Sequence, residues 1–234
     1  VEMTIRALAR AGIDIEEVDE AGPVRTWHVF PGRPSPGDTD IEPDLSNAGP
    51  FLAAAMVTGG RVRVPGWPRA TSQPGDAWRA ILGHMGARVE LGDDGLTVEG
   101  PGAGNYPGID ADMSAVGELT PALAAICASA SSPSRLSGIA HLRGHETDRV
   151  AALATELNRL GGDAQDGGDC LAIAPAPLRP GTVETYEDHR MAAFGAVLGL
   201  TTAGVGVRDI ECTSKTLPGF ARMWAGALAG GREP

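Results

Sequence analysis

Three basic residues stand where helices are expected to begin. In "ETYEDHRMAAFG", Asp188 precedes an Ala/Met/Leu-rich run, which predicts that Asp188 caps a helix and that Arg190 lies in its first turn. A helix N-terminus carries partial positive charge, so a cation there is unfavourable unless an anion accompanies it. Arg149, in "ETDRVAALATELNRL", and Lys215, before an expected first helical residue at Pro218, have similar positions. Together they indicate a site for a small, strongly anionic ligand.

Acidic residues lie among these cations. Glu118 opens an expected helix at the place that Asp188 takes in a later one. Glu146 lies three residues before Arg149, and we expect both in the first turn of one helix, on its inward face. Near bound anions the pKa of a carboxylate rises, which suits proton transfer close to neutral pH. The plainer interpretation is that the helix dipole stabilises both acids at helix N-termini, and that Glu146 caps its helix and forms an intrahelical ion pair.

Internal repeats predict how these positions come together. Three stretches, beginning at Ser46, Gly117 and Glu187, share a polar start, an alanine-rich helix, a small-residue break and a short strand. A second helix and a hairpin follow in the first two, and residues 2–31 match only this second half. Equivalent glycines end the second helices, namely Gly12, Gly86 and Gly161. The repeating unit is helix–strand–helix–strand–strand, and parallel packing of the repeats would bring the helix N-termini to one face.

The domain organisation follows from these repeats. Residues 32–43, "GRPSPGDTDIEP", form a Pro/Gly-rich connector without periodicity. We therefore expect residues 1–43 to be the end of another lobe plus the connector, and residues 44–234 to be a lobe of three repeats. The chain lacks an initiating Met and starts inside a helical pattern. These features predict the C-terminal part of a longer protein.

Composition narrows the class of protein. The 234 residues are 42% apolar, and no apolar run is long enough for a membrane span or forms a secretory signal. A net charge of −11 and an aromatic content of 4% argue against nucleic-acid binding. The three cysteines lack metal-like spacing, so we expect reduced thiols in a soluble, cytoplasmic protein. Among the 19 basic residues only Lys215 is a lysine, which indicates a site that needs an ammonium group, or the chance survival of a surface lysine.

Three motifs carry a family resemblance. "HETDR" (145–149), "DHRMA" (188–192) and "SKTLPGF" (214–220), in this order, resemble the enolpyruvyl transferases, and most closely the 5-enolpyruvylshikimate-3-phosphate synthase family. The resemblance covers almost the whole chain, as the C-terminal half of such an enzyme. It implies a two-domain, inside-out α/β fold in which each domain has three βαβαββ units.

The same resemblance implies an activity. The two domains would close over phosphoenolpyruvate and shikimate 3-phosphate. The enolpyruvyl group would pass to the 5-hydroxyl of the shikimate through a tetrahedral ketal, releasing phosphate. No metal or organic cofactor is implied, and neither a nucleic acid nor a membrane partner; the complete protein would be a monomer. The missing half would hold further basic residues, so we expect this chain alone to be inactive.

Site residues are carried over by position. Arg149, Arg190 and Lys215 resemble the phosphoenolpyruvate clamp. Glu118 falls where the family has an acid, usually Asp, that accepts the proton of the shikimate hydroxyl. Glu146 matches the acid near the enol carbon, a candidate proton donor.

Three histidines complete the comparison. His145 falls where many members have a lysine contacting the shikimate phosphate, and His141 where an asparagine is common, so details of shikimate binding differ here. His189 would lie near the departing phosphate, although a single histidine at the position of His145 or His189 is more often a polar side chain on the surface without a role in the site. Two alternatives stay open: the sister enzyme that acts on UDP-N-acetylglucosamine, and a non-catalytic anion-binding module.

Overall fold

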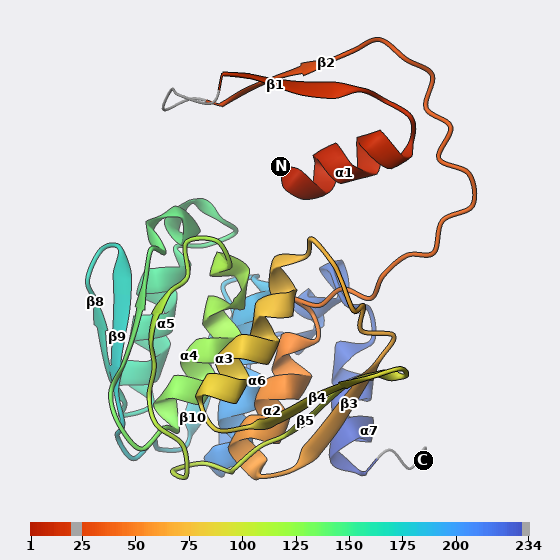
Figure 1. The fold of residues 1–234 in the computed structure, drawn as a ribbon. Helices are drawn as coiled ribbons and strands as arrows, with labels where there is room; N and C mark the ends of the chain where they lie inside the picture. Colours follow the sequence, from red (N-terminus) through yellow and green to blue (C-terminus); the bar gives the residue numbers. More distant parts are fainter. Residues whose placement is uncertain (20–24, 231–234) are drawn as a thin grey trace.

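The computed structural model describes residues 1–19 and 25–230. Its first part is a helix followed by an antiparallel hairpin: α1 (Glu2–Arg10), β1 (Ile15–Asp19) and β2 (Thr26–Val29). This segment stands apart from the rest of the chain and is joined to it by an extended connector (Figure 1). No residue of α1 is buried. A helix and one hairpin bury too little apolar surface to be stable alone, so this segment needs a further partner.

The first repeat of the body has the predicted order of elements. Its elements are α2 (Gly49–Thr58), β3 (Arg61–Pro65), the 3₁₀ turn η1 (Pro74–Ala77), α3 (Trp78–His84), β4 (Arg88–Gly92) and β5 (Gly95–Glu99). The strands form an antiparallel sheet in the order β3-β5-β4. Valines and leucines alternate with charged residues along β3 and β4, so one face of this sheet packs on the helices and the other faces water.

The second repeat is complete. It consists of β6 (Asp110–Asp112), η2 (Gly117–Leu119), α4 (Thr120–Ala128), β7 (Ser134–Ser137), η3 (Ala140–Gly144), α5 (Arg149–Arg159), β8 (Asp163–Asp166) and β9 (Cys170–Ala174). Its sheet order is β6-β7-β9-β8, in which β6 is parallel to β7 and β9 is antiparallel to both of its neighbours, β7 and β8. This is the βαβαββ unit that the family resemblance implies, and the sequence repeats predict all of it except the leading strand β6.

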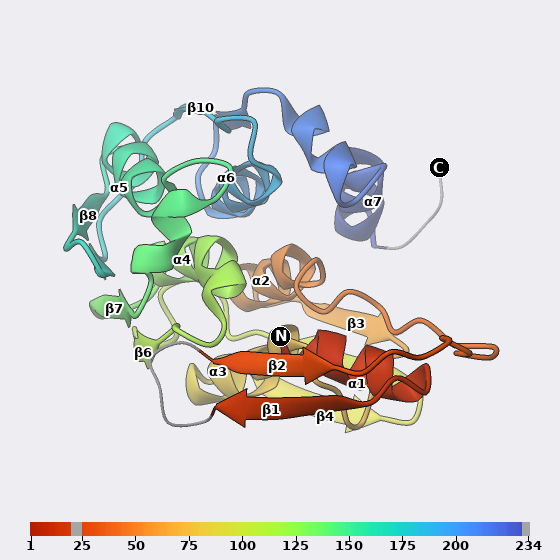
Figure 2. The same ribbon diagram turned by 90° about the horizontal axis from the view of Figure 1, so that it is seen from above.

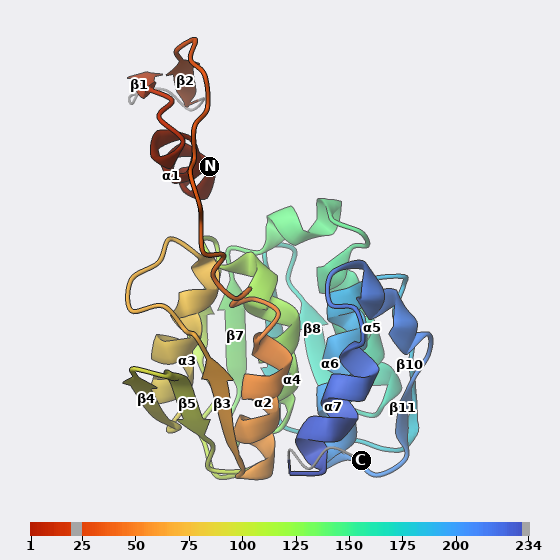
Figure 3. The ribbon, with the colours of Figure 1, turned by 90° about the vertical axis from the view of Figure 1, so that its right-hand side faces the viewer.

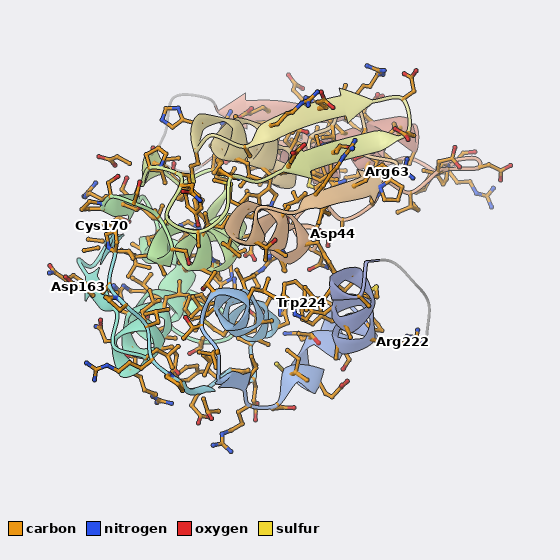
Figure 4. All side chains as sticks on the ribbon, turned by 90° about the horizontal axis from the view of Figure 1, so that it is seen from below. Asp44, Arg63, Asp163, Cys170, Arg222 and Trp224 are labelled. Atoms are coloured by element: carbon orange, nitrogen blue, oxygen red, sulfur yellow. The ribbon has the colours of Figure 1, made fainter. Side chains whose placement is uncertain are left out.

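The third repeat is partial within the described residues. Its elements are β10 (Gly181–Val183), α6 (His189–Thr201), β11 (Val205–Val207), η4 (Ile210–Lys215) and α7 (Phe220–Leu228). The strands β10 and β11 are parallel, like β6 and β7, but no described strand of a hairpin lies beside them. On α7 only Phe220 is buried. Trp224 points from α7 toward the space between α2 and α6 (Figure 4), where its ring lies 5.6 Å from that of Phe51.

The helices α2, α4 and α6 form the centre of the body, with the three sheets outside them (Figures 2 and 3). These helices are rich in alanine and apolar on all sides, which lets them pack closely in the interior. Their N-terminal residues line one small cavity, so the three helices begin on the same face. The inside-out α/β arrangement and the parallel packing of the repeats are therefore both confirmed.

The left-handed glycines predicted after the second helices are confirmed. Gly12, Gly86 and Gly161 all have positive φ, between 77° and 93°. The thiols of Cys127, Cys170 and Cys212 are all free. Within the described part of the chain, no helix has the length and apolar character needed to cross a membrane.

Two helix starts differ from the prediction. Asp148 caps α5 by accepting a hydrogen bond from the Ala151 N–H, so the helix begins at Arg149 and Glu146 lies in the bend before it. α7 begins at Phe220 after Gly219, whose φ is 79°, so Pro218 lies outside the helix. Asp188 caps α6 as predicted, accepting from the Arg190 N–H at 2.8 Å.

We expect the central helices to dominate stability. Leu123 on α4 is fully buried, so Leu123→Ala should lower the free energy of unfolding by about 2–5 kcal/mol. Leu228→Ala, at a residue that is 52% exposed on α7, should change it by less than about 0.5 kcal/mol. Urea unfolding of both variants tests this. Equal losses would contradict the central position of α4.

Candidate active site

Arg149 is the centre of a charged network at the helix N-termini. Its side chain is 1% exposed, and its guanidinium contacts three carboxylates. Nε donates to Asp188 Oδ2 at 2.7 Å, Nη2 to Glu146 Oε2 at 2.7 Å, and Nη1 to Glu118 Oε2 at 3.1 Å. Burial alone would lower the pKa of Arg149, but these hydrogen bonds and charges raise it. The network joins residues from η2, the bend before α5, and α6.

Arg190 obtains its partner from the preceding repeat. Its Nη1 donates to the backbone carbonyl of Glu118 at 3.0 Å, and its Nε lies in ionic contact with Glu118 Oε2 without an aligned hydrogen bond. Burial lowers the pKa of Arg190, and the Glu118 carboxylate opposes that effect. Glu118 therefore compensates the unfavourable position of a cation in the first turn of α6.

Lys215 completes the set of cations from the third repeat. Its Nζ donates to Glu146 Oε1 at 3.0 Å, while the other Glu146 oxygen is held by Arg149. Burial would raise the pKa of Glu146, but the Lys215 hydrogen bond, with the Arg149 and Lys215 charges, lowers it to about 2. The pKa of Glu146 is therefore lowered by its cations, whereas an acid beside bound anions is expected to have a raised pKa.

Comparisons with known proteins agree with this geometry. The family model for EPSP synthase (3-phosphoshikimate 1-carboxyvinyltransferase) matches residues 1–224. The chain belongs to the EPSP synthase family. The 3-phosphoshikimate 1-carboxyvinyltransferase of Kocuria rhizophila is 57% identical over 225 residues, which are 96% of this chain and 49% of that protein. The chain thus spans about half the length of this curated relative.

Solved structures show the same fold. The EPSP synthase of Acinetobacter baumannii superimposes with a TM-score of 0.78 at 22% identity, over 95% of this chain and 53% of that one. The enolpyruvyl transferase NikO of Streptomyces tendae gives a TM-score of 0.68 at 23% identity, over 96% of this chain and 52% of that one. These likenesses confirm the predicted enolpyruvyl transferase-like fold.

The histidines of the family motifs surround the network. His145 Nδ1 lies 3.3 Å from Glu118 Oε1, and the His141 ring lies 6.1 Å from the His145 ring. His189 is buried, unlike the surface residue of the plainer interpretation. Burial and the Arg190 charge lower its pKa, which favours the neutral imidazole at neutral pH. Its Nδ1 has no hydrogen-bond partner among the described residues.

His141 also restricts the backbone beside Glu118. A Cβ atom at Gly117 would lie 2.3 Å from His141 Nε2, so only glycine allows this ring to pack there. The loop before α4 and the turn η3 are thereby in direct contact. Glu118 directly follows Gly117, and His145, Glu146 and Arg149 follow η3 along the chain, so this contact lies next to four of the six predicted site residues.

The charges of this network balance one another. The cations Arg149, Arg190 and Lys215 face the anions Glu118, Glu146 and Asp188. The cavity beside them is only about 30 Å³, enough for a water molecule or two. A dianionic ligand would therefore need the acids to move, or further cations from elsewhere. Among residues 1–19 and 25–230, no group of three or more His, Cys, Asp or Glu is placed to hold a metal ion.

Sequence reasoning missed one contact of this site. Asp188 was predicted only as the cap of α6, yet it is fully buried and pairs with Arg149 across 39 residues of chain. An aspartate one or two residues before an arginine signals a cap and gives no indication of a distant partner. All six predicted site residues, from Glu118 to Lys215, do lie in the one network.

The charge network determines the protonation of the Glu146 carboxyl, which can be measured. Because its pKa in the folded protein is about 2, below the ordinary 4.5, the ionised carboxylate stabilises the protein above about pH 4.5 and this contribution is lost as the pH falls toward 2. Lys215→Gln removes the hydrogen bond to Glu146 and should raise this pKa. At about pH 4, carbon NMR of the Glu146 carboxyl should show more protonation in Lys215→Gln than in the parent protein.

A matched control is Arg222→Gln, which removes an exposed cation from α7, outside the network. It should leave the Glu146 resonance unchanged. If Lys215→Gln and Arg222→Gln behave alike, the ion pair does not set the protonation of Glu146.

Proposed function

We propose that this chain forms the C-terminal half of an enzyme that transfers the enolpyruvyl group of phosphoenolpyruvate to the 5-hydroxyl of shikimate 3-phosphate, releasing phosphate. The observation that carries the proposal is the network in which Arg149, Arg190 and Lys215 meet Glu118 and Glu146 at converging helix N-termini. The name of the Kocuria rhizophila relative supports this reaction. Such an enzyme would be a transferase of aromatic amino acid biosynthesis, with a cytoplasmic location.

The cations would bind the donor. Two guanidiniums, of Arg149 and Arg190, flank the Glu118 carboxylate, and a ligand carboxylate has the same charge and planar shape. Lys215, the more exposed of the cations, would reach the phosphate of phosphoenolpyruvate. Fixed positive charge near the phosphate would also stabilise it as it departs.

The acids would move the protons. Glu118, displaced from the arginines, would accept the proton of the 5-hydroxyl while the hydroxyl oxygen bonds to C2 of the enolpyruvyl group. Glu146 would deliver a proton to C3, which gives the tetrahedral ketal. In the second step C3 loses a proton, the double bond re-forms and the C2–phosphate oxygen bond breaks. A Glu146 that is held ionised by Lys215 cannot donate, so the proposal requires the donor anion to draw Lys215 and Arg149 away from it.

The remainder of the protein would complete the site. Phosphoenolpyruvate and shikimate 3-phosphate together need more positive charge than the three cations can offer, because acids of the site already balance these cations. We propose that residues 1–43 end the N-terminal lobe and that residues 44–234 form the C-terminal lobe. The unburied α1 and the partial third repeat support a partner for each part. The complete enzyme would be a monomer whose two lobes bring both substrates into reacting geometry.

The two alternative functions predict a different acceptor or no turnover. A UDP-N-acetylglucosamine enolpyruvyl transferase would use the same donor but another acceptor; the EPSP synthase family match disfavours it. A non-catalytic anion-binding module would bind phosphoenolpyruvate without turnover. The charge network alone suits either a binding module or an enzyme, so turnover decides.

The activity can be measured as phosphate release from phosphoenolpyruvate plus shikimate 3-phosphate. We expect none from this chain alone and clear release when it is mixed with its upstream half, because the second set of cations is then present. Turnover by this chain alone would show that the site is complete without the other lobe. No release from a mixture that is folded and associated would favour the binding module.

In the complete protein, Glu118→Gln should reduce kcat by a factor of about 10²–10⁴, the usual contribution of a general base. Glu211→Gln, which neutralises an exposed acid on η4, is the matched control and should leave kcat unchanged. Equal activity of the two variants would remove Glu118 from the chemistry.

A further inference from the structure

A buried acid that the proposed chemistry does not use lies seven residues beyond Arg149 on α5. Glu156 is fully buried, and its carboxylate accepts hydrogen bonds from two groups of the loop before α6. Oε2 accepts from the Glu184 N–H at 3.0 Å, and Oε1 accepts from the Tyr186 hydroxyl at 2.6 Å. Arg159 Nη2 lies 3.3 Å from Oε1 and balances the charge. Every oxygen of Glu156 is thus committed to this loop or to its own helix.

The same loop has a strained backbone. Tyr186 and Glu187 both have left-handed φ angles, 55° and 57°, which non-glycine residues rarely adopt. Two such residues in succession turn the chain sharply, and Asp188 follows directly as the cap of α6. Conformations of this kind persist only where surrounding contacts enforce them, and they gather at functional sites. The Glu156 carboxylate holds the Glu184 N–H and the Tyr186 hydroxyl, while Arg208 and Arg159 pair with the Glu184 side chain.

Both ends of the loop are therefore fixed to α5. Arg149 holds Asp188 at the first turn of α5, and Glu156 holds Glu184 and Tyr186 two turns later. Residues seven apart lie on the same face of a helix, about 10 Å along its axis. Between these two anchors the loop directs Asp188 onto Arg149, and Arg190 onto Glu118.

We propose that Glu156 and Tyr186 are positioning residues for the anion site: their hydrogen bond holds the left-handed turn that places Asp188 and Arg190. Neither Glu156 nor Tyr186 touches the cations of the site. The change in KM that we expect rests on the proposed function. The Tyr186 hydroxyl stays protonated as the donor, since burial and the Glu156 contact raise the pKa of Tyr186 to about 12. If the turn loosened, Arg190 would leave the position at which we propose that it binds phosphoenolpyruvate.

The test uses the complete enzyme with Tyr186→Phe. Loss of a hydrogen bond to a carboxylate should raise KM for phosphoenolpyruvate about tenfold. Amide hydrogen exchange at residues 185–190 should become faster, and the KM for shikimate 3-phosphate should change less. The matched control is Tyr106→Phe, which removes a buried tyrosine hydrogen bond, to the Ile126 carbonyl, at the opposite end of α4. Its KM and its exchange at residues 185–190 should match those of the parent.

A second variant separates positioning from general destabilisation. Glu187→Gly in the Tyr186→Phe background should recover part of the KM, because glycine adopts the left-handed conformation without strain. If Tyr186→Phe shifts KM and local exchange no more than Tyr106→Phe does, the proposal is overturned. If the parent enzyme shows no turnover, the proposed function fails, and the exchange at residues 185–190 alone decides whether the contact holds the turn.

Discussion

The site depends on one buried ion pair, between Arg149 and Asp188. Both side chains are essentially inaccessible to water, at 1% and 0% exposure, so removing either would leave an uncompensated charge in the interior. The pair joins the first turn of α5 to the cap of α6, and hence the second repeat to the third. Because its position is fixed, the remaining N–H groups of Arg149 are aimed at Glu118 and Glu146.

The acids of the site pair with its cations, so their charges balance. Glu118 stands between Arg149 and Arg190, and Glu146 between Arg149 and Lys215. An anionic substrate therefore competes with carboxylates of the protein itself. In the proposed enzyme this competition would help proton transfer, since displacement from Lys215 and Arg149 removes the contacts that lower the pKa of Glu146 and lets it hold and deliver a proton. Binding and proton transfer would be coupled through the same contacts.

Much of this arrangement could be predicted from the sequence, because it follows from local patterns that repeat. The alanine-rich helices, the positive-φ glycines and the Asp188 cap each have a local signal. The family motifs contain five of the six site residues, and Glu118 is matched by its position; the structure brings all six into one network. The Arg149–Asp188 pair and the Glu156 contacts could not be predicted, since each joins segments about 30–40 residues apart and depends on helix packing. The predicted start of α5 was wrong because Asp148, two residues after Glu146, caps the helix.

The most direct test is a crystal structure of the complete protein with phosphoenolpyruvate and shikimate 3-phosphate. The account predicts that the phosphoenolpyruvate carboxylate lies between Arg149 and Arg190, where the Glu118 carboxylate lies in the ligand-free protein, and that Lys215 has moved from Glu146 to the phosphate. The Arg149–Asp188 pair should be unchanged. A structure in which Glu118 and Glu146 keep their cations while the ligand binds elsewhere would contradict it.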